Sequence, residues 1–159
     1  MEVSIFFVFA VFFSIIFFDR YLMHNQVKTK LERILNSKKE YLLKKENVIT
    51  ETFTVGLRNS RYHFRKSDLY FFENAFVIVG FYKIFKIKVY SCIILISNKE
   101  EFTSDESLHN ILIKNLKKFN NQSSNNSVYV EFGEASFTST NISVRLKNLS
   151  EQEKQAINF

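Results

Sequence analysis

Seven basic residues between positions 58 and 88 are the part of this sequence whose types and spacing suit a binding site. They stand against only two acidic residues, Asp68 and Glu73, so the segment carries a strong positive charge. Alternate residues of a β-strand share a face, and cations aligned in this way can bind phosphate groups, which arginine contacts with two hydrogen bonds. The candidate binding residues are Arg58, Arg61, Arg65, Lys83, Lys86 and Lys88.

This basic cluster has two interpretations. The alternating cations of residues 61–65 share one strand face, and those of residues 86–88 share a face of a later strand. They can bind anionic lipid headgroups, or they can form the solvated face of a half-exposed sheet. Nucleic acid is not an expected partner, because the interleaved Tyr62 and Phe64 occupy the opposite face, which we expect to point into the core.

No other group of residues predicts catalysis, a metal site or a cofactor. The three histidines lack metal-ligand spacing, and the three glycines form no phosphate-binding loop. No serine lies in a G-x-S-x-G turn. The single cysteine, Cys92, lies in the apolar run SCIILIS, where a small core residue is expected. We therefore expect a protein that is not an enzyme and binds no metal or cofactor.

An uncharged run from Val3 to Phe18, which contains seven phenylalanines, indicates the cellular location of the protein. A core helix is usually amphipathic, and this run is apolar on all sides. A signal peptide has a basic residue before its apolar run and a small-residue cleavage site after it, and neither is found here. Residues 1–23 therefore predict a retained single-pass transmembrane helix. The alternative is the apolar stalk of an oligomer.

The charges that flank this helix predict its orientation. Residues 19–45 contain eight lysines and arginines against three acidic residues, and no base precedes the apolar run. The positive-inside rule places the N-terminus outside and the remainder in the cytoplasm, at the inner membrane. Four glycosylation sequons would fit the opposite orientation, but a chain this rich in Asn and Ser contains them by chance: Asn121, Asn125, Asn141 and Asn148.

Residues 24–46 predict a basic amphipathic helix that continues from the membrane span. Its apolar residues recur at helical spacing, with the bases mainly off the stripe. Such a helix can lie along an anionic surface, pair with a second copy, or pack its stripe on the following domain. The stripe consists of Val27, Leu31, Ile34, Leu35 and Leu42.

Residues 47–159 change to a β pattern. Residues 68–81 read as a hairpin that turns at Glu73 and Asn74, where Asn can adopt positive φ. Residues 108–119 place their apolar side chains on one helical face. Ser150 and Glu153 form a capping box that opens a C-terminal helix. Further strands are expected at 48–57, 61–66, 83–97, 128–137 and 141–148, with loops at 98–107 and 120–127.

The order of these elements resembles the pleckstrin-homology-like (PH-like) family over residues 48–159. The segment ENAFVIVGF is similar to the middle hairpin of bacterial members. The resemblance implies an α+β protein, in which a PH-like antiparallel β-barrel or sandwich of about seven strands, with an inserted helix and a C-terminal capping helix, follows the transmembrane helix. The family's terminal-helix tryptophan has no counterpart here. Phosphoinositide-binding members use basic residues on the first strands, where this chain has His63 and Arg65.

Together these features predict a membrane protein that works by interaction. The first hypothesis is an accessory or scaffolding subunit that holds a protein partner, or copies of itself, at the lipid bilayer. The second is a module that binds anionic lipid headgroups through the basic cluster. The third, an enzyme on an uncharacterised scaffold, is disfavoured by the missing catalytic residues.

Overall fold

A long helix precedes a sheet of eight strands in the computed structural model. The structure describes residues 2–38, 41–55, 62–99, 101–105, 107–123, 126–134 and 140–157. The helices are α1 (Glu2–Ser37) and the short α2 (Glu151–Gln155). The strands are β1 (Leu43–Val55), β2 (Lys66–Phe72), β3 (Ala75–Ile84), β4 (Ile87–Ser97), β5 (Leu108–Leu112), β6 (Leu116–Ser123), β7 (Ser127–Glu134) and β8 (Thr140–Leu146).

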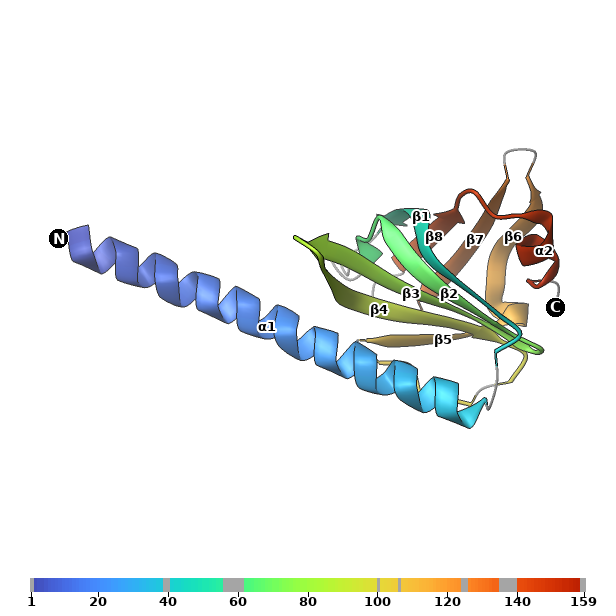
Figure 1. Ribbon diagram of the computed structural model, residues 1–159, viewed down its shortest axis with the longest axis horizontal. Helices are drawn as coiled ribbons and strands as arrows, with labels where there is room; N and C mark the ends of the chain where they lie inside the picture. Colours follow the sequence, from blue (N-terminus) through green and yellow to red (C-terminus); the bar gives the residue numbers. More distant parts are fainter. Residues whose placement is uncertain are drawn as a thin grey trace.

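The strands form one mixed sheet in the order β5-β4-β3-β2-β1-β8-β7-β6. Neighbouring strands are antiparallel, except that β4 and β5 are parallel. Strands β5 and β6 lie at opposite ends of this order, yet the 3-10 turn η2 (Ile113–Asn115) alone joins them. The sheet therefore has to curl until its two edges approach, and the domain is barrel-like (Figure 1). The fold is α+β.

The inward faces of the strands build the main core. It contains side chains from β1–β5, β7 and β8, together with Leu149 and Ile157 from the C-terminal segment. Ile94, from the apolar run that contains Cys92, is fully enclosed here. Ser150 opens α2 with the expected capping box, its hydroxyl accepting the N–H of Glu153. The C-terminal segment thus contributes to the core of the barrel-like domain.

A second core lies between α1 and the outer face of β2–β4. Val27, Leu31 and Ile34 of the helix stripe pack there against outward-facing residues of the strands. Strands β2–β4 are therefore buried on both faces, which explains their nearly continuous apolar sequences. Of the alternatives for the amphipathic segment, packing on the following domain is the one observed.

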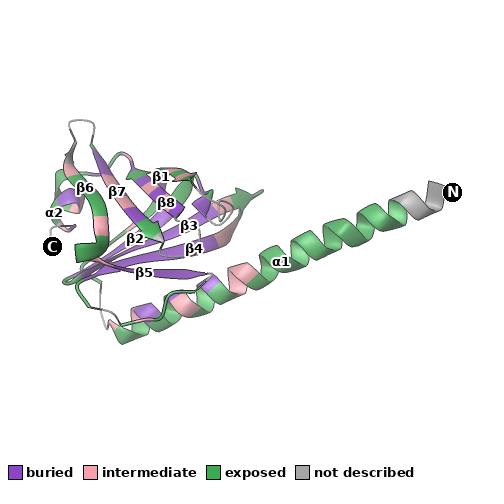
Figure 2. Cartoon of the chain, turned by 180° about the vertical axis from the view of Figure 1, so that it is seen from behind, coloured by how far each residue is buried: buried purple, intermediate pink, exposed green. Residues whose placement is uncertain are grey.

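The helix α1 is continuous from Glu2 to Ser37, which makes it about 54 Å long. Residues 6–22 are exposed and project away from the domain, whereas the second half lies on the sheet (Figure 2). The first half is not a buried core helix, and α1 is long and apolar enough to cross a membrane. The helix ends sooner than the expected residue 46, and residues 43–46 already belong to β1.

The helix expected at residues 108–119 is wrong, because this segment forms β5, η2 and the start of β6. Leu108 packs in the core beneath α1, whereas Ile111 packs inside the barrel. Two residues separated by three positions face opposite sides in a strand but share a face in a helix. The described part of the chain consequently has eight strands, not seven. The loop expected at 120–127 is partly wrong as well, since β6 extends to Ser123.

The hairpin expected within residues 68–81 is confirmed, with β2 and β3 joined at Glu73 and Asn74. Asn74, at this turn, does not adopt a positive φ.

Phe85, with a φ of 55°, and Lys86 form a second turn, between β3 and β4. The single strand expected at 83–97 is therefore wrong. Residues 62–65 alternate between buried and exposed as expected, but they precede β2 and belong to no strand.

Candidate functional site

The structure separates the six predicted binding residues into three groups. Arg58 and Arg61 lie outside the described residues. Arg65 is exposed just before β2. The other three belong to the β3–β4 hairpin, where Lys83 and Lys86 are exposed but Lys88 is half-buried. The predicted cluster is therefore not one uniform face.

Lys88 takes part in a structural ion-pair network. Its Nζ lies 2.7 Å from Oδ2 of Asp68, whose side chain is only 3% exposed, and 3.5 Å from Oε2 of Glu46. Nζ also lies 4.7 Å from the centre of the Phe81 ring. Burial opposes the charge of Lys88, but the hydrogen bond and charge of Asp68, with a contribution from Glu46, outweigh it and raise the Lys88 pKa. The expectation that Lys86 and Lys88 share a face of one strand is wrong, because Lys86 lies in the turn before β4.

A bulge in β1 explains why the Asp68 carboxylate is buried. Strand β1 carries a bulge between Lys45 and Val48, opposite β2, and Asn47 adopts a φ of 57° within it. A bulge leaves backbone groups without their ladder partners. The Oδ1 atom of Asp68 accepts the N–H of Asn47 at 2.9 Å. Asp68 and Lys88 together thus stabilise an irregularity of the sheet.

The tip of the β3–β4 hairpin is the most exposed apolar feature of the barrel-like domain. Phe85 is 96% exposed, Ile87 69% and Ile84 38%. The exposed Lys83 and Lys86 lie among them along the turn. Sequence reasoning missed this tip because residues 85–89, F-K-I-K-V, alternate as a strand does and the segment contains none of the usual turn residues. In both views the hairpin reaches further toward the N-terminal end of α1 than the rest of the domain (Figures 1 and 2).

A second exposed apolar feature lies on the outer face of β1, on the side of the sheet that α1 leaves uncovered. Ile49, Phe53 and Val55 point outward at even spacing, with Glu51 between them. The neighbouring strand β8 places the partly or fully exposed Asn141, Ser143 and Arg145 on this face. We call Ile49, Phe53 and Val55 the β1 stripe.

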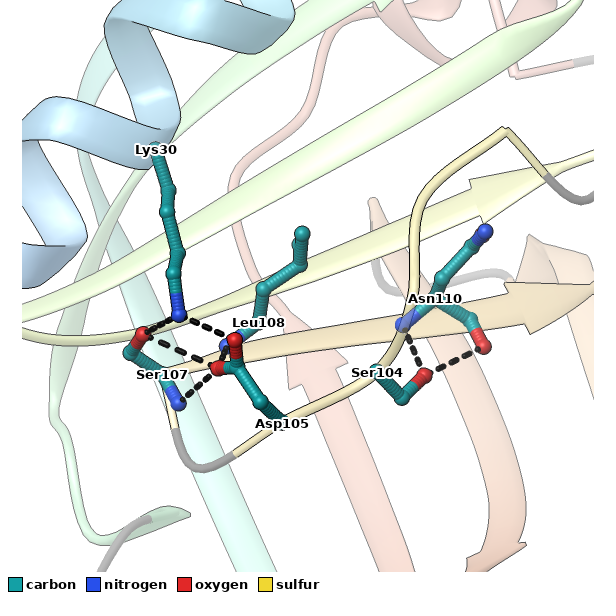
Figure 3. Close-up of polar contacts among 6 residues, drawn as sticks. All are labelled: Lys30, Ser104, Asp105, Ser107, Leu108 and Asn110. Carbon is teal, nitrogen blue, oxygen red and sulfur yellow. Dashed lines mark hydrogen bonds and ion pairs between the residues drawn. The ribbon is translucent and has the colours of Figure 1, made fainter.

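Polar contacts along its second half attach α1 to the sheet. Nδ1 of His24 accepts the N–H of Tyr90 at 3.1 Å, and Lys38 Nζ lies 2.7 Å from Oε2 of Glu101. Between them, Lys30 pairs with Asp105 and donates to the hydroxyl of Ser107 at 2.5 Å (Figure 3). These contacts are distributed over about four turns of the helix.

Within this attachment, the Asp105 carboxylate is held by several hydrogen bonds. Its Oδ1 accepts the backbone N–H groups of Ser107 and Leu108 at 2.8 and 3.1 Å, and its Oδ2 meets Lys30 (Figure 3). Burial alone would raise its pKa, but these hydrogen bonds lower it to about 2. The carboxylate is consequently charged at neutral pH, and the loop before β5 is fixed against α1.

The groups most often used in catalysis are not assembled in the described part of the chain. Burial raises the pKa of the Cys92 thiol to about 12, so it stays protonated inside the core. His24 contacts Tyr90, His63 is exposed, and His109 packs against Tyr62 with ring centres 4.8 Å apart. The described residues contain no group of three His, Cys, Asp or Glu that could hold a metal ion.

Comparison with known proteins gives no match among protein-family models, curated proteins or solved structures.

Proposed function

We propose that this chain is a non-enzymatic, single-pass membrane protein whose barrel-like domain acts as an interaction module of a membrane complex. In this proposal α1 anchors the domain at the inner membrane, with the N-terminus outside and the domain in the cytoplasm. The domain then presents its uncovered faces to a protein partner or to a second copy. The observation that carries the proposal is the division of α1 into an exposed apolar half and a docked half.

The continuity of α1 favours an anchor over a cleaved signal sequence. The helix runs without a break from the apolar residues into the stripe of Val27, Leu31 and Ile34. Cleavage near residue 23 would separate the apolar half of α1 from the half that packs on the sheet. Within the apolar half, the hydroxyl of Ser14 donates to the carbonyl of Ala10 at 2.8 Å. A polar group satisfied inside its own helix suits a lipid environment, where no water is available.

The way in which α1 docks supports a scaffolding role. Contacts from His24 to Lys38 hold the helix along the sheet, so no flexible linker separates the membrane span from the domain. The domain would therefore have a fixed orientation above the bilayer. A fixed orientation favours assembly, because a partner in the same membrane meets the same surface each time and less freedom is lost on binding.

The β1 stripe is the surface that we assign to the protein partner. Exposed aromatic and aliphatic residues that lie together on an uncovered sheet face are typical of protein interfaces. Phe53 lies at its centre and is 68% exposed. When F53S is purified from native membranes, we expect that proteins which co-purify with the wild type are no longer recovered. The matched control is L42S, because Leu42 is 69% exposed and lies outside this stripe. Equal recovery of the same chains with F53S would contradict this assignment.

The PH-like identity of the domain is part of the proposal. A strongly curved, mostly antiparallel sheet and a short C-terminal helix that contributes to the core support it. The eight strands and the parallel pairing of β4 with β5 depart from it. A second candidate function, binding of anionic headgroups, is favoured by the exposure of Arg65, Lys83 and Lys86, and not by Lys88.

The anchor and its orientation are tested by cysteine labelling of intact cells. Cys92 is buried, so the native thiol should not react with a membrane-impermeant maleimide. We expect E2C to be labelled in intact cells and N74C to be labelled only after permeabilisation. Sodium carbonate should leave both variants in the membrane fraction. Release by carbonate would contradict the anchor, and the reverse labelling pattern would contradict the orientation.

A further inference from the structure

The tip of the β3–β4 hairpin has a composition that neither the core nor the turn requires. Phe85 is almost completely exposed and contributes nothing to either core. Its φ of 55° lies in the left-handed region, where glycine or asparagine is favoured and a bulky residue is rare. A phenylalanine at this position is explained neither by packing nor by backbone preference. Its exposed ring is therefore a candidate for contact with something outside the chain.

The attachment of α1 shows where this tip lies along the helix. His24 contacts Tyr90, and at the other end Lys38 pairs with Glu101, just beyond β4, so α1 and β4 run in the same direction. Ile87 is three residues before Tyr90, which places it about 10 Å nearer the N-terminal end of α1 at the usual rise of a strand. Since a helix rises about 1.5 Å per residue, that distance corresponds to about seven residues before His24, close to Phe17.

This level lies about five residues, or about 8 Å, inside the cytoplasmic end of the proposed membrane span. A hydrocarbon core about 30 Å thick needs about 20 apolar residues, so a span that begins near Val3 leaves the hydrocarbon close to Leu22. The hairpin tip therefore lies at the depth of the acyl chains that adjoin the headgroups. Both views agree, because the β3–β4 hairpin reaches further toward the N-terminal end of α1 than the rest of the domain (Figures 1 and 2).

We propose that the tip of the β3–β4 hairpin inserts Phe85, Ile84 and Ile87 into the membrane interface beside α1, while Lys83 and Lys86 contact lipid phosphates. This inference rests on the proposed membrane anchor and adds a second point of attachment. Apolar side chains in the interface with lysines beside them follow the pattern of peripheral membrane insertion. The long lysine side chains can reach the anionic headgroups from there.

The lipid bilayer is the occupant because of the position and composition of the tip. A cytosolic protein partner would have to reach a hairpin that lies against the membrane surface. The apolar tip instead lies toward the exposed and mostly apolar residues 6–22, and the two exposed lysines complement the negative charge of the cytoplasmic leaflet. Two attachment points would also fix the tilt of the barrel-like domain relative to the bilayer.

The absence of tryptophan from the sequence allows a direct test with the full-length protein. F85W places a single indole at the tip, and L42W is the control, since Leu42 is exposed and lies beyond the far end of α1. Both variants are reconstituted into vesicles that contain phosphatidylserine, with and without dibrominated acyl chains. We expect the F85W emission to be shifted to shorter wavelength and quenched by the brominated lipid. The L42W emission should remain that of a solvated indole.

Three outcomes would overturn the inference, and they can be distinguished. Retention of the protein after carbonate treatment, with unquenched and solvated F85W emission, would contradict hairpin insertion and leave the anchor standing. A shifted but unquenched F85W emission would place a protein surface, not lipid, over the tip. Release by carbonate would contradict the proposed function and the inference together. A double variant, K83Q/K86Q on the F85W background, should weaken the quenching in phosphatidylserine vesicles.

Discussion

Nδ1 of His24 accepts the backbone N–H of Tyr90 at 3.1 Å, and the two rings stack with their centres 5.3 Å apart. The N–H is available because Ser91 is an extra residue in β4, opposite the step from Gly80 to Phe81. This contact holds α1 at the point where the helix leaves the domain. It therefore also determines how far the β3–β4 hairpin lies from the exposed half of the helix.

Replacement of His24 tests this contact. H24A leaves the partly buried N–H of Tyr90 without its acceptor, which should cost about 1–2 kcal/mol of unfolding free energy. The measurement is chemical unfolding of the full-length protein in detergent, together with hydrogen exchange at the Tyr90 amide. H63A is the control, because His63 is exposed and its loss should cost about 0.5 kcal/mol at most. Unchanged exchange at Tyr90 would show that the stacked histidine does not hold the strand.

The two lysines of the predicted binding face should behave differently. K88Q leaves the buried Asp68 carboxylate without its cation and should destabilise the protein by about 1–3 kcal/mol. K86Q, at the exposed turn, should change the unfolding free energy by about 0.5 kcal/mol or less. Urea unfolding curves measure both values. Equal stability of the two variants would mean that Lys88 has no structural role.

The attachment of Asp105 predicts a stability change in acid. Its pKa is about 2 in the folded protein, below the ordinary value of 3.8, so its contribution is complete above about pH 5 and is lost as the pH falls through 4 toward 2. Because the side chain is 44% exposed, solvent screening reduces this contribution to about 1 kcal/mol or less.

D105N should therefore be less stable than the wild type at pH 7 and should approach it near pH 2. Circular dichroism of the full-length protein in detergent, followed against urea at several pH values, measures the difference. E73Q, on the exposed β2–β3 turn, provides the control. A constant difference between D105N and the wild type across this range would contradict the role assigned to the Asp105 charge.

Two strand glycines provide a matched test of packing. A Cβ on Gly80 would collide with the ring of Phe64, which is buried in the main core and cannot move freely. G80A should therefore cost about 1–3 kcal/mol, the usual range for overpacking. A Cβ on Gly133 would instead meet the end of the flexible Lys117 side chain, with Cε 2.9 Å away.

G133A should consequently cost about 0.5 kcal/mol or less, and the lower backbone entropy of alanine can offset even that. Thermal unfolding of the two alanine variants in the same detergent compares them directly. If G80A were tolerated as well as G133A, Phe64 would not fill the space over Gly80.

Local patterns were sufficient to predict several elements of this protein. The apolar run and the stripe of Val27, Leu31 and Ile34 predicted α1, because helical periodicity depends only on neighbours along the chain. The β2–β3 hairpin and the capping box of Ser150 and Glu153 depend on equally short separations. Buried positions such as Ile94 followed from the same apolar patterns.

Long-range pairing decided what the sequence left ambiguous. Residues 108–119 have helical spacing, yet β5 pairs with β4, and β6 pairs with β7, so the sheet determines their conformation. The turn at Phe85 lacks the residues that mark turns. Lys88 and Lys86 look equivalent in the sequence, but only the fold brings Asp68, 20 residues away, against Lys88. Such contacts join segments that are distant in the chain, and their energies depend on a geometry that no local pattern contains.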